Sequence, residues 1–313
     1  MTAERSLRER WIYAAKVDSW PKLLVPFLLG QAIGLGAGGG PSLLAFAFGL
    51  AFTVCDLLFV VFLNDVGDRK VDAVKRRMFP RGCSPKTIPD RILPAYQLLL
   101  AGAGAGLAAM AVATVGGVVL DRPAFGVLGL VALLTFVAYT LPPLRLNYRG
   151  GGELLEMLGV GVLLPVLSAY VQGGGGRVTG FALLPGFASL SLASAIASGL
   201  ADERSDRRGG KRTFVTLFGN RAARRAVERL TFLGALLWSG LPLVSPLPWW
   251  LGAGAGSVVV AHGLALRRAS PRARTDAFDA QRAYKAHLHH AIWRGAMVAA
   301  LLLTYWHLVL GRR

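Results

Sequence analysis

The 313-residue chain is poor in the residues on which water-soluble and secreted folds depend. Charged residues make up 17% of it, whereas soluble domains carry about a quarter. It has only two cysteines, Cys55 in an apolar run and Cys83 in a polar loop, which are too few for a disulfide framework or a zinc site. The N-terminal residues lack the apolar core and cleavage site of a signal peptide. These deficits exclude a soluble enzyme, a disulfide-built secreted domain and a disordered chain.

Apolar residues are abundant and arranged in long blocks. They make up 54% of the chain, and the mean hydropathy is +0.49. The blocks are about 20 residues long, the length of helix that crosses about 30 Å of hydrocarbon. Clusters of glycine and proline separate several of them. The sequence therefore predicts an all-α, polytopic membrane protein. About nine transmembrane helices are expected, at roughly 20–38, 42–63, 93–120, 124–141, 153–172, 180–201, 229–246, 249–266 and 290–310.

The distribution of basic residues predicts the orientation. The net charge of +18 comes from 35 Lys and Arg residues, and the nine spans place 31 of them on one side and 4 on the other. By the positive-inside rule, the N-terminus and the loops after even-numbered spans are cytoplasmic. Topology thus explains the net charge, and nucleic acid is not an expected partner. Anionic membrane lipid and an anionic substrate are expected partners instead.

Residues 1–16 differ from the rest of the chain. Leu7, Trp11, Ile12 and Ala15 recur at helical spacing among charged residues, which predicts a short amphipathic helix lying at the membrane interface. Residues 17–313 are interpreted as one transmembrane domain in the cytoplasmic or inner membrane.

Two clusters of acidic residues lie where predicted spans meet the cytoplasm. After the second span, Asp65, Asp68 and Asp72 are spaced i, i+3, i+7, which confines them to an arc of about 60° if the helix continues. After the sixth span, Asp202 and Asp206 are spaced i, i+4 and also share a face. Carboxylates gathered beside hydrocarbon repel one another and lose hydration. For either cluster alone, solvated loop charges are an equally good interpretation.

The two clusters together favour a metal–diphosphate site. Mg²⁺ prefers oxygen ligands and is usually shared between a few carboxylates and substrate phosphates. Lys211 and Arg212 closely follow the second cluster, so cations would neutralise the phosphate oxygens that the metal leaves free. The hypothesis is a site that binds a diphosphate through Mg²⁺.

The motifs resemble those of the UbiA superfamily of intramembrane prenyltransferases. Residues 64–72, Asn-Asp-x-x-Asp-x-x-x-Asp, are similar to its first acidic motif, and residues 202–219 to its second. Residues 139–146, Tyr-x-x-Pro-Pro-x-Arg, resemble the segment after its fourth helix. Residues 149–153 and 169–173 resemble the fifth helix of members that prenylate 1,4-dihydroxy-2-naphthoate or related quinone precursors.

The resemblance covers residues 17–310 and implies a fold and a reaction. The implied fold is a helical bundle around a central apolar cavity. The implied enzyme is a membrane-bound, Mg²⁺-dependent prenyltransferase. It transfers a prenyl group from a polyisoprenyl diphosphate to a hydrophobic, aromatic quinone precursor and releases diphosphate.

The resemblance also assigns roles to residues. The catalytic residues it implies are Asp68, Asp72, Asp202, Asp206 and Tyr139, whose ring would stabilise an allylic cation. The Mg²⁺ ligands it implies are Asn64, Asp68, Asp72, Asp202 and Asp206. The substrate-binding residues it implies are Asn64, Asp65, Arg145, Lys211 and Arg212.

Two segments depart from the family pattern, and other functions stay open. The loop 75–87 is basic but lacks the usual Arg-Pro stretch, and Trp20-Pro21 stands where relatives often have Arg-Pro. The acceptor can therefore also be non-aromatic or a tetrapyrrole. A transporter of anionic substrates is the alternative from another class, although transporters bind near the midplane and these acidic pairs lie at span ends.

The sequence leaves several points undecided. They are the acceptor, the prenyl chain length, the deprotonating base and the oligomeric state. Asp56 lies within an apolar span, where an ionisable residue is a functional candidate, but a neutral, hydrogen-bonded Asp is an equally good interpretation. Three histidines flank the last span and favour an interfacial role over a metal cluster: His287, His289 and His290.

Overall fold

The computed structural model describes residues 5–37, 40–80, 82–176, 179–275 and 277–310. Within these ranges the secondary structure is helical and contains no strand, which confirms the all-α prediction. The α-helices are α1 (Leu7–Ala15), α2 (Pro21–Gly34), α3 (Leu43–Met78), α4 (Ala95–Val119), α5 (Ala124–Thr140), α6 (Gly152–Leu158), α7 (Leu164–Gly173), α8 (Leu184–Ser198), α9 (Glu203–Arg208), α10 (Phe214–Ser239), α11 (Trp249–Ala269) and α12 (Phe278–Tyr305).

Most helices coincide with the predicted spans, and three begin or end elsewhere. Six helical segments in the described part of the chain are long and apolar enough to cross a membrane. Helix α3 runs on to Met78, so the first acidic motif is helical, whereas the predicted span ended at residue 63. Helix α10 begins at Phe214, well before the predicted start at 229. Helix α12 begins at Phe278, whereas the predicted span began at residue 290. The count of nine spans stays a prediction.

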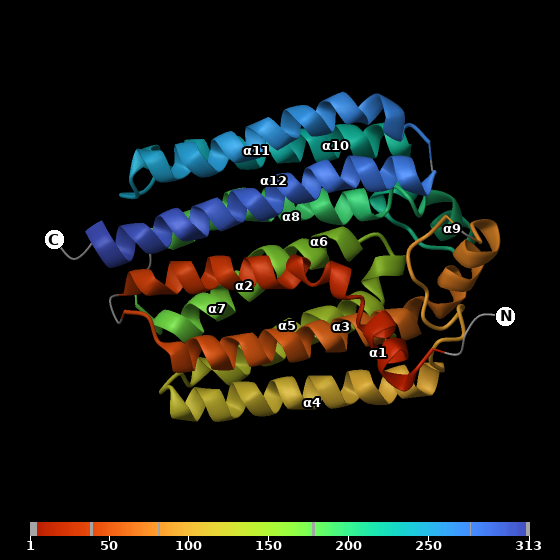
Figure 1. Ribbon diagram of the computed structural model, residues 1–313, viewed down its shortest axis with the longest axis horizontal. Coiled ribbons are helices and arrows are strands. Elements are labelled where there is room, and N and C mark those ends of the chain that lie inside the picture. The colour runs from red at the N-terminus through yellow and green to blue at the C-terminus, as the bar shows by residue number, and fades with distance from the viewer. Residues whose placement is uncertain (1–4, 38–39, 81, 177–178, 276, 311–313) are drawn as a thin grey trace.

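The bundle has two large hydrophobic cores in halves that lie side by side (Figure 1). One gathers residues of α2, α8, α10, α11 and α12 around the buried Phe187 and Trp238. The other gathers residues of α3, α4, α5 and α7 around Phe52 and Phe125, whose rings meet edge to face at 5.6 Å. Two smaller apolar clusters accompany them in the described residues. Each core buries large apolar side chains, so each half of the bundle is a rigidly packed unit.

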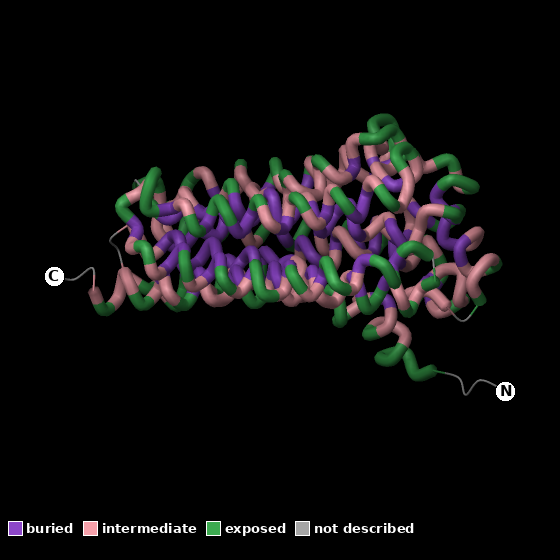
Figure 2. Tube along the Cα trace, turned by 90° about the horizontal axis from the view of Figure 1, so that it is seen from above, coloured by how far each residue is buried: buried purple, intermediate pink, exposed green. Residues whose placement is uncertain are grey.

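Apolar side chains also cover the outside of the bundle. Leu43, Leu107 and Val118 are 82%, 74% and 80% exposed. Figure 2 shows buried residues along the middle of the bundle and exposed ones on its outward turns. A soluble protein rarely exposes so many apolar side chains together, so these faces are suited to contact with lipid. Helix α1 begins with a capping box formed by Ser6 and Glu9, and its position at the membrane interface stays a prediction.

Helices α2 and α7 pack with their backbones in contact. A Cβ atom placed on Gly30 would lie 2.4 Å from the Pro165 carbonyl oxygen and 2.6 Å from Ser168 Cβ. Glycine is therefore required at this crossing, as it is at many close helix crossings in membranes. The buried Gln31 amide also donates to the Ser168 carbonyl at 2.9 Å.

We expect Gly30→Ala to destabilise the fold by about 1–3 kcal/mol, because the new methyl group forces two backbones apart. Gly104→Ala in α4 is the matched control, since no atom lies within 4 Å of its Cβ position; it should change stability by at most about 1 kcal/mol. Unfolding in mixed micelles with increasing denaturing detergent measures both. Equal stability of the two variants would contradict the close crossing.

Candidate active site

Both acidic motifs lie at the same end of the bundle, where α3 ends and α9 follows α8 (Figure 1). Because α3 remains helical, it carries three carboxylates into a protected position. Asp65, Asp68 and Asp72 are only 2%, 8% and 6% exposed. Buried carboxylates need partners, and the structure supplies them.

Ion pairs join the two motifs in both directions. The ammonium of Lys211, which follows the second motif, donates to Asp68 of the first motif at 2.6 Å. Conversely, the ammonium of Lys75, on the first-motif helix, forms an ion pair with Asp202 of the second. Tyr148 adds a hydrogen bond from its hydroxyl to Asp68 at 3.1 Å. The structure therefore brings the two motifs together, as the sequence predicts.

A glycine allows α9 to approach α3. A Cβ atom on Gly209 would lie 2.3 Å from Val71 Cγ2, so a side chain there would push the second motif away from the first. The next residue, Gly210, has φ of +76°, a conformation that glycine adopts readily. This turn directs the chain back so that Lys211 reaches Asp68.

The loop after α3 and the end of α1 supply the remaining partners. The Lys86 ammonium donates to Asp72 at 2.5 Å. Thr87 donates its hydroxyl to Asp65 at 2.6 Å, and Lys16 forms an ion pair with the same carboxylate.

Burial and neighbouring charges shift the protonation of the groups outside the spans. Burial raises the pKa of Asp206 to about 6, a shift that the Lys211 ammonium opposes and the Asp68 carboxylate supports. Burial opposes the charge of Lys211, but the Asp68 and Asp206 carboxylates raise the pKa of its ammonium above the ordinary value. Burial, followed by Asp68, also raises the pKa of Tyr148, so this hydroxyl stays a hydrogen-bond donor.

The donor set is suited to a hard cation, although its carboxylates pair with lysines here. No group of three or more His, Cys, Asp or Glu side chains in the described ranges is positioned to hold a metal ion. The Asp206 carboxyl is 6% exposed, and its oxygens accept no hydrogen bond from the described residues. Carboxylate oxygens are the ligands that Mg²⁺ prefers. The residues present therefore fit a magnesium site.

The two arginines predicted to bind phosphate, Arg145 and Arg212, differ in their distance from the acidic cluster and in their exposure. The Arg145 guanidinium donates to the Gly67 carbonyl at 2.6 Å and stacks on the Tyr148 ring at 3.6 Å, so it borders the site. The Arg212 side chain is exposed, and its backbone N–H donates to the Tyr148 carbonyl at 3.3 Å.

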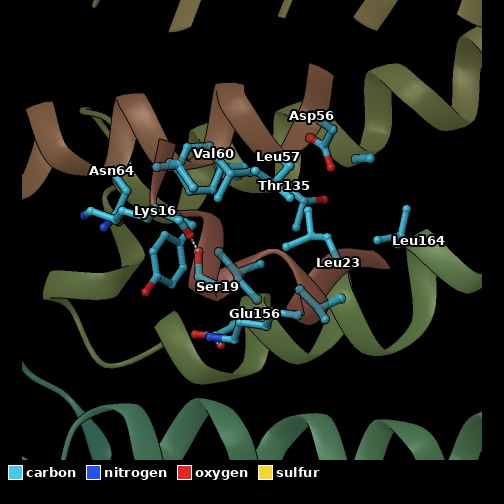
Figure 3. A pocket seen from close by; sticks show the side chains of 18 residues that line it. Lys16, Ser19, Leu23, Asp56, Leu57, Val60, Asn64, Thr135, Glu156 and Leu164 are labelled. Carbon is cyan, nitrogen blue, oxygen red and sulfur yellow. Dashed lines mark hydrogen bonds and ion pairs between the residues drawn. The ribbon is translucent and has the colours of Figure 1, made fainter. Parts of the chain in front are cut away.

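A cavity of about 270 Å³ opens beside this cluster, between α2, α3, α5 and α6. Figure 3 shows Asn64, Lys16 and Glu156 around one part of it, and Asp56 and Leu164 at the opposite end. The walls between are mainly apolar. The residues that line it are Lys16, Ser19, Lys22, Leu23, Asp56, Leu57, Val60, Val61, Asn64, Ala132, Thr135, Phe136, Tyr139, Leu155, Glu156, Gly159, Val160 and Leu164.

The predicted Tyr139 lines this cavity and stacks on Phe136, with ring centroids 5.9 Å apart. Glu156 also lines it and forms an ion pair with Lys22 at 2.5 Å. Glu153 instead accepts a hydrogen bond from the Phe214 backbone N–H at 2.6 Å, which caps the start of α10. Of the two acidic residues that open the fifth span, only Glu156 therefore contacts the cavity.

The histidines lie away from the cavity lining. His289 stacks on Trp293 at 4.6 Å, and His290 lies 5.6 Å from His262. The interfacial role of the histidines stays a prediction.

Several residues of the site are not apparent as partners from the sequence. Lys75 follows Asp72 by three residues, so helical spacing places it on the acidic face. Lys75 could therefore have been predicted from the sequence as a partner of the carboxylates. Lys16, Lys86 and Tyr148 are far from the motifs along the chain, and local spacing gives no signal for them. Asn147 is 4% exposed, and its amide atoms have no hydrogen-bond partner in the described part of the chain.

The helical bundle carries two paired acidic motifs beside a mainly apolar cavity. The family model of the UbiA prenyltransferase family matches residues 23–293. The chain belongs to this family and is an integral-membrane prenyltransferase.

Solved structures share the fold at low sequence identity. A UbiA homologue from Archaeoglobus fulgidus bound to DMAPP and Mg²⁺ is 16% identical with a TM-score of 0.69, over 90% of this chain and 99% of that one. The same homologue bound to GPP and Mg²⁺ gives 16% identity and a TM-score of 0.65, with the same coverage. A homologue from Aeropyrum pernix gives 13% and 0.67, over 89% and 97%. The comparison with curated proteins finds no significant match.

Hydrogen bonds to the Asp90 carboxylate, here called the Asp90 clamp, hold the loop 82–94 in place. Asp90 accepts hydrogen bonds from the Tyr13 hydroxyl at 2.6 Å and the Arg76 guanidinium at 2.6 Å, and from the Lys86 backbone N–H at 3.0 Å. Burial opposes the charge of Asp90, but the bonds from Arg76 and Tyr13 hold its pKa below the ordinary value of 3.8. Because the pKa is lowered in the folded state, the clamp stabilises the fold above that ordinary value and is lost as pH falls through the lowered pKa.

We expect Asp90→Ala to release this loop and to raise amide hydrogen exchange in residues 82–94 about tenfold, because three donors lose their shared acceptor. The exposed Asp18→Ala is the control and should leave that exchange unchanged. Hydrogen–deuterium exchange with mass spectrometry at neutral pH measures both. Unchanged protection in Asp90→Ala would show that other contacts hold the loop.

Proposed function

We propose that this chain transfers a prenyl group from a polyisoprenyl diphosphate to a hydrophobic, aromatic quinone precursor and releases diphosphate. The observation that carries the proposal is the convergence of two acidic motifs through the Lys211–Asp68 and Lys75–Asp202 pairs, beside an apolar cavity. The homologue structures described above hold DMAPP or GPP together with Mg²⁺, which supports the same donor class here.

The acidic motifs would hold the metal. Mg²⁺, when bound, supplies positive charge that offsets the charge of the leaving diphosphate. The residues proposed to hold it are Asn64, Asp68, Asp72, Asp202 and Asp206.

The lysines of the ion pairs would hold the diphosphate. Lys75 and Lys86 neutralise carboxylates in the structure, so a metal on those carboxylates would leave the ammonium groups available for phosphate oxygens. Lys211 and Arg145 both lie against the Tyr148 ring, and Lys211 also pairs with Asp68. Fixed cations at the leaving group favour the transition state, in which its negative charge grows. Asp65 and Arg212 complete the proposed substrate-binding set.

The cavity would bind the prenyl tail and exclude water. Leu57, Val60 and Phe136 form an apolar wall directly beside Asn64, so an allylic cation formed there is shielded from hydrolysis. The ring of Tyr139 faces the same cavity, and cation–π attraction would stabilise the developing positive charge. In this step the C–O bond to diphosphate breaks, an acceptor carbon forms a bond to C1 of the allylic cation, and the acceptor then loses a proton.

Polar groups at the diphosphate end of the cavity favour a phenolic acceptor. Ser19, Lys22 and Glu156 line it there and offer both donors and acceptors to ring hydroxyl groups. Together with the resemblance of residues 149–153 and 169–173, this supports an acceptor like 1,4-dihydroxy-2-naphthoate. Assays with this naphthoate, 4-hydroxybenzoate, homogentisate, a haem and a lipid alcohol would rank the acceptors.

We also propose the orientation and the domain limits. The concentration of Lys and Arg on one side supports a cytoplasmic N-terminus and cytoplasmic acidic motifs. Residues 17–313 would form one transmembrane domain, and residues 1–16 would lie at the interface.

We expect Asp68→Ala and Asp202→Ala each to lower diphosphate release at least about 100-fold, because each removes a group that holds the charge of the leaving group. Purified protein with labelled prenyl diphosphates, the acceptor panel and Mg²⁺ provides the assay. Asp279→Ala, an exposed position in the first turn of α12, should keep wild-type activity. Wild-type turnover in both motif variants would end the assignment.

A further inference from the structure

Asp56 is a carboxyl group within the wall of the cavity. It is 7% exposed and lines the cavity from α3. Figure 3 shows its oxygens directed into the space, at the end where Leu164 lies and away from Asn64. Its neighbours on the lining, Leu57 and Val60, are apolar.

Asp56 differs from the other buried carboxylates of α3. Asp65, Asp68 and Asp72 each accept a hydrogen bond from a lysine, whereas Asp56 has no hydrogen bond or ion pair with any residue in the described ranges. Thr53 lies three residues earlier and is also buried, but its hydroxyl donates a hydrogen bond to the Gly49 carbonyl at 2.8 Å. A buried carboxyl needs partners in either protonation state, so whatever fills the cavity beside Asp56 must offer hydrogen bonds.

Helix geometry gives the depth of Asp56. It lies eight residues before Asn64 on the continuous helix α3, which corresponds to about 12 Å at the α-helical rise. An isoprene unit adds four bonds to an extended chain, about 4–5 Å by ordinary bond lengths and angles. A tail of two units that begins at the level of Asn64 therefore ends before Asp56, and a tail of four units passes it.

The size of the cavity agrees with that limit. It measures about 270 Å³, and a cavity of about 150 Å³ holds one benzene-sized group. The space therefore suits about two such groups, close to a tail of ten carbons. A longer tail would cover the Asp56 carboxyl with hydrocarbon.

We propose that Asp56 sets the length of the prenyl tail, so that the site accepts ten-carbon donors and disfavours twenty-carbon donors. This inference rests on the proposed function. The short tail ends before Asp56 and leaves the carboxyl free to accept hydrogen bonds at the end of the cavity. The long tail leaves it buried without a hydrogen-bond partner, which opposes binding.

The test compares kcat/KM for the C10 and C20 diphosphates with the same acceptor and Mg²⁺. The wild type should favour C10 over C20 about tenfold or more, the effect of leaving one buried polar group unpaired. Asp56→Leu, nearly the same in shape, should raise the C20:C10 ratio about tenfold. Asp56→Asn keeps a polar group and should keep the wild-type ratio. Thr53→Val, on the same helix but outside the cavity lining, is the matched control and should also keep it.

Two results would overturn the inference. One is a wild type that uses the C20 diphosphate as well as the C10 diphosphate. This result does not depend on whether any variant folds. The other is a folded Asp56→Leu whose C20:C10 ratio equals that of the wild type. In both cases transfer still occurs, so the proposed function survives. A wild type that transfers neither donor to any acceptor would instead contradict the proposed function itself.

Discussion

The structure depends on the compensation of negative charge at the end of an apolar bundle. Asp68 is buried and is neutralised by Lys211, which comes from the other motif. Removing one partner of a buried ion pair typically costs about 3–5 kcal/mol, because the remaining charge is left uncompensated. Asp202 keeps 31% of its side chain exposed, so solvent screening reduces the corresponding cost for its pair with Lys75. These two pairs of unequal strength hold the loop around α9 against α3, and with it both halves of the site.

This end of the bundle is also where the two hydrophobic cores leave a space. Tight packing around Trp238 and around Phe125 makes each half rigid, and the cavity lies between α2, α3, α5 and α6. The charged cluster lies at one end of this space, and its walls are mainly apolar. An amphiphilic ligand therefore has one favourable orientation, with its charged head at the ion pairs and its body along α3.

The sequence predicts the local features of this arrangement and misses the tertiary ones. The i, i+3, i+7 spacing correctly places Asp65, Asp68 and Asp72 on one helical face, because that periodicity follows from backbone geometry alone. The docking of α9 depends on the missing side chain at Gly209, whose importance appears only when Val71 lies against it. The pairing of Lys86 with Asp72 likewise depends on the path of a loop. The number and orientation of the spans stay predictions, because the structure carries no membrane.

Lysine and arginine pair with different carboxylates around the site. In the described part of the chain, lysine forms the ion pairs on Asp65, Asp68, Asp72 and Asp202, whereas the exposed Arg207 pairs with Glu203 within the second motif. Outside the motifs, arginine holds Asp90 in the clamp. The planar guanidinium fork of arginine matches one carboxylate geometry and fixes it, whereas the lysine ammonium is a point charge on a flexible stem. A lysine therefore exchanges a carboxylate oxygen for a phosphate oxygen by rotating its side chain, without moving the helix that carries it. Arginine serves the contact that must persist through turnover, and lysine serves the contacts that the proposed reaction must open and close.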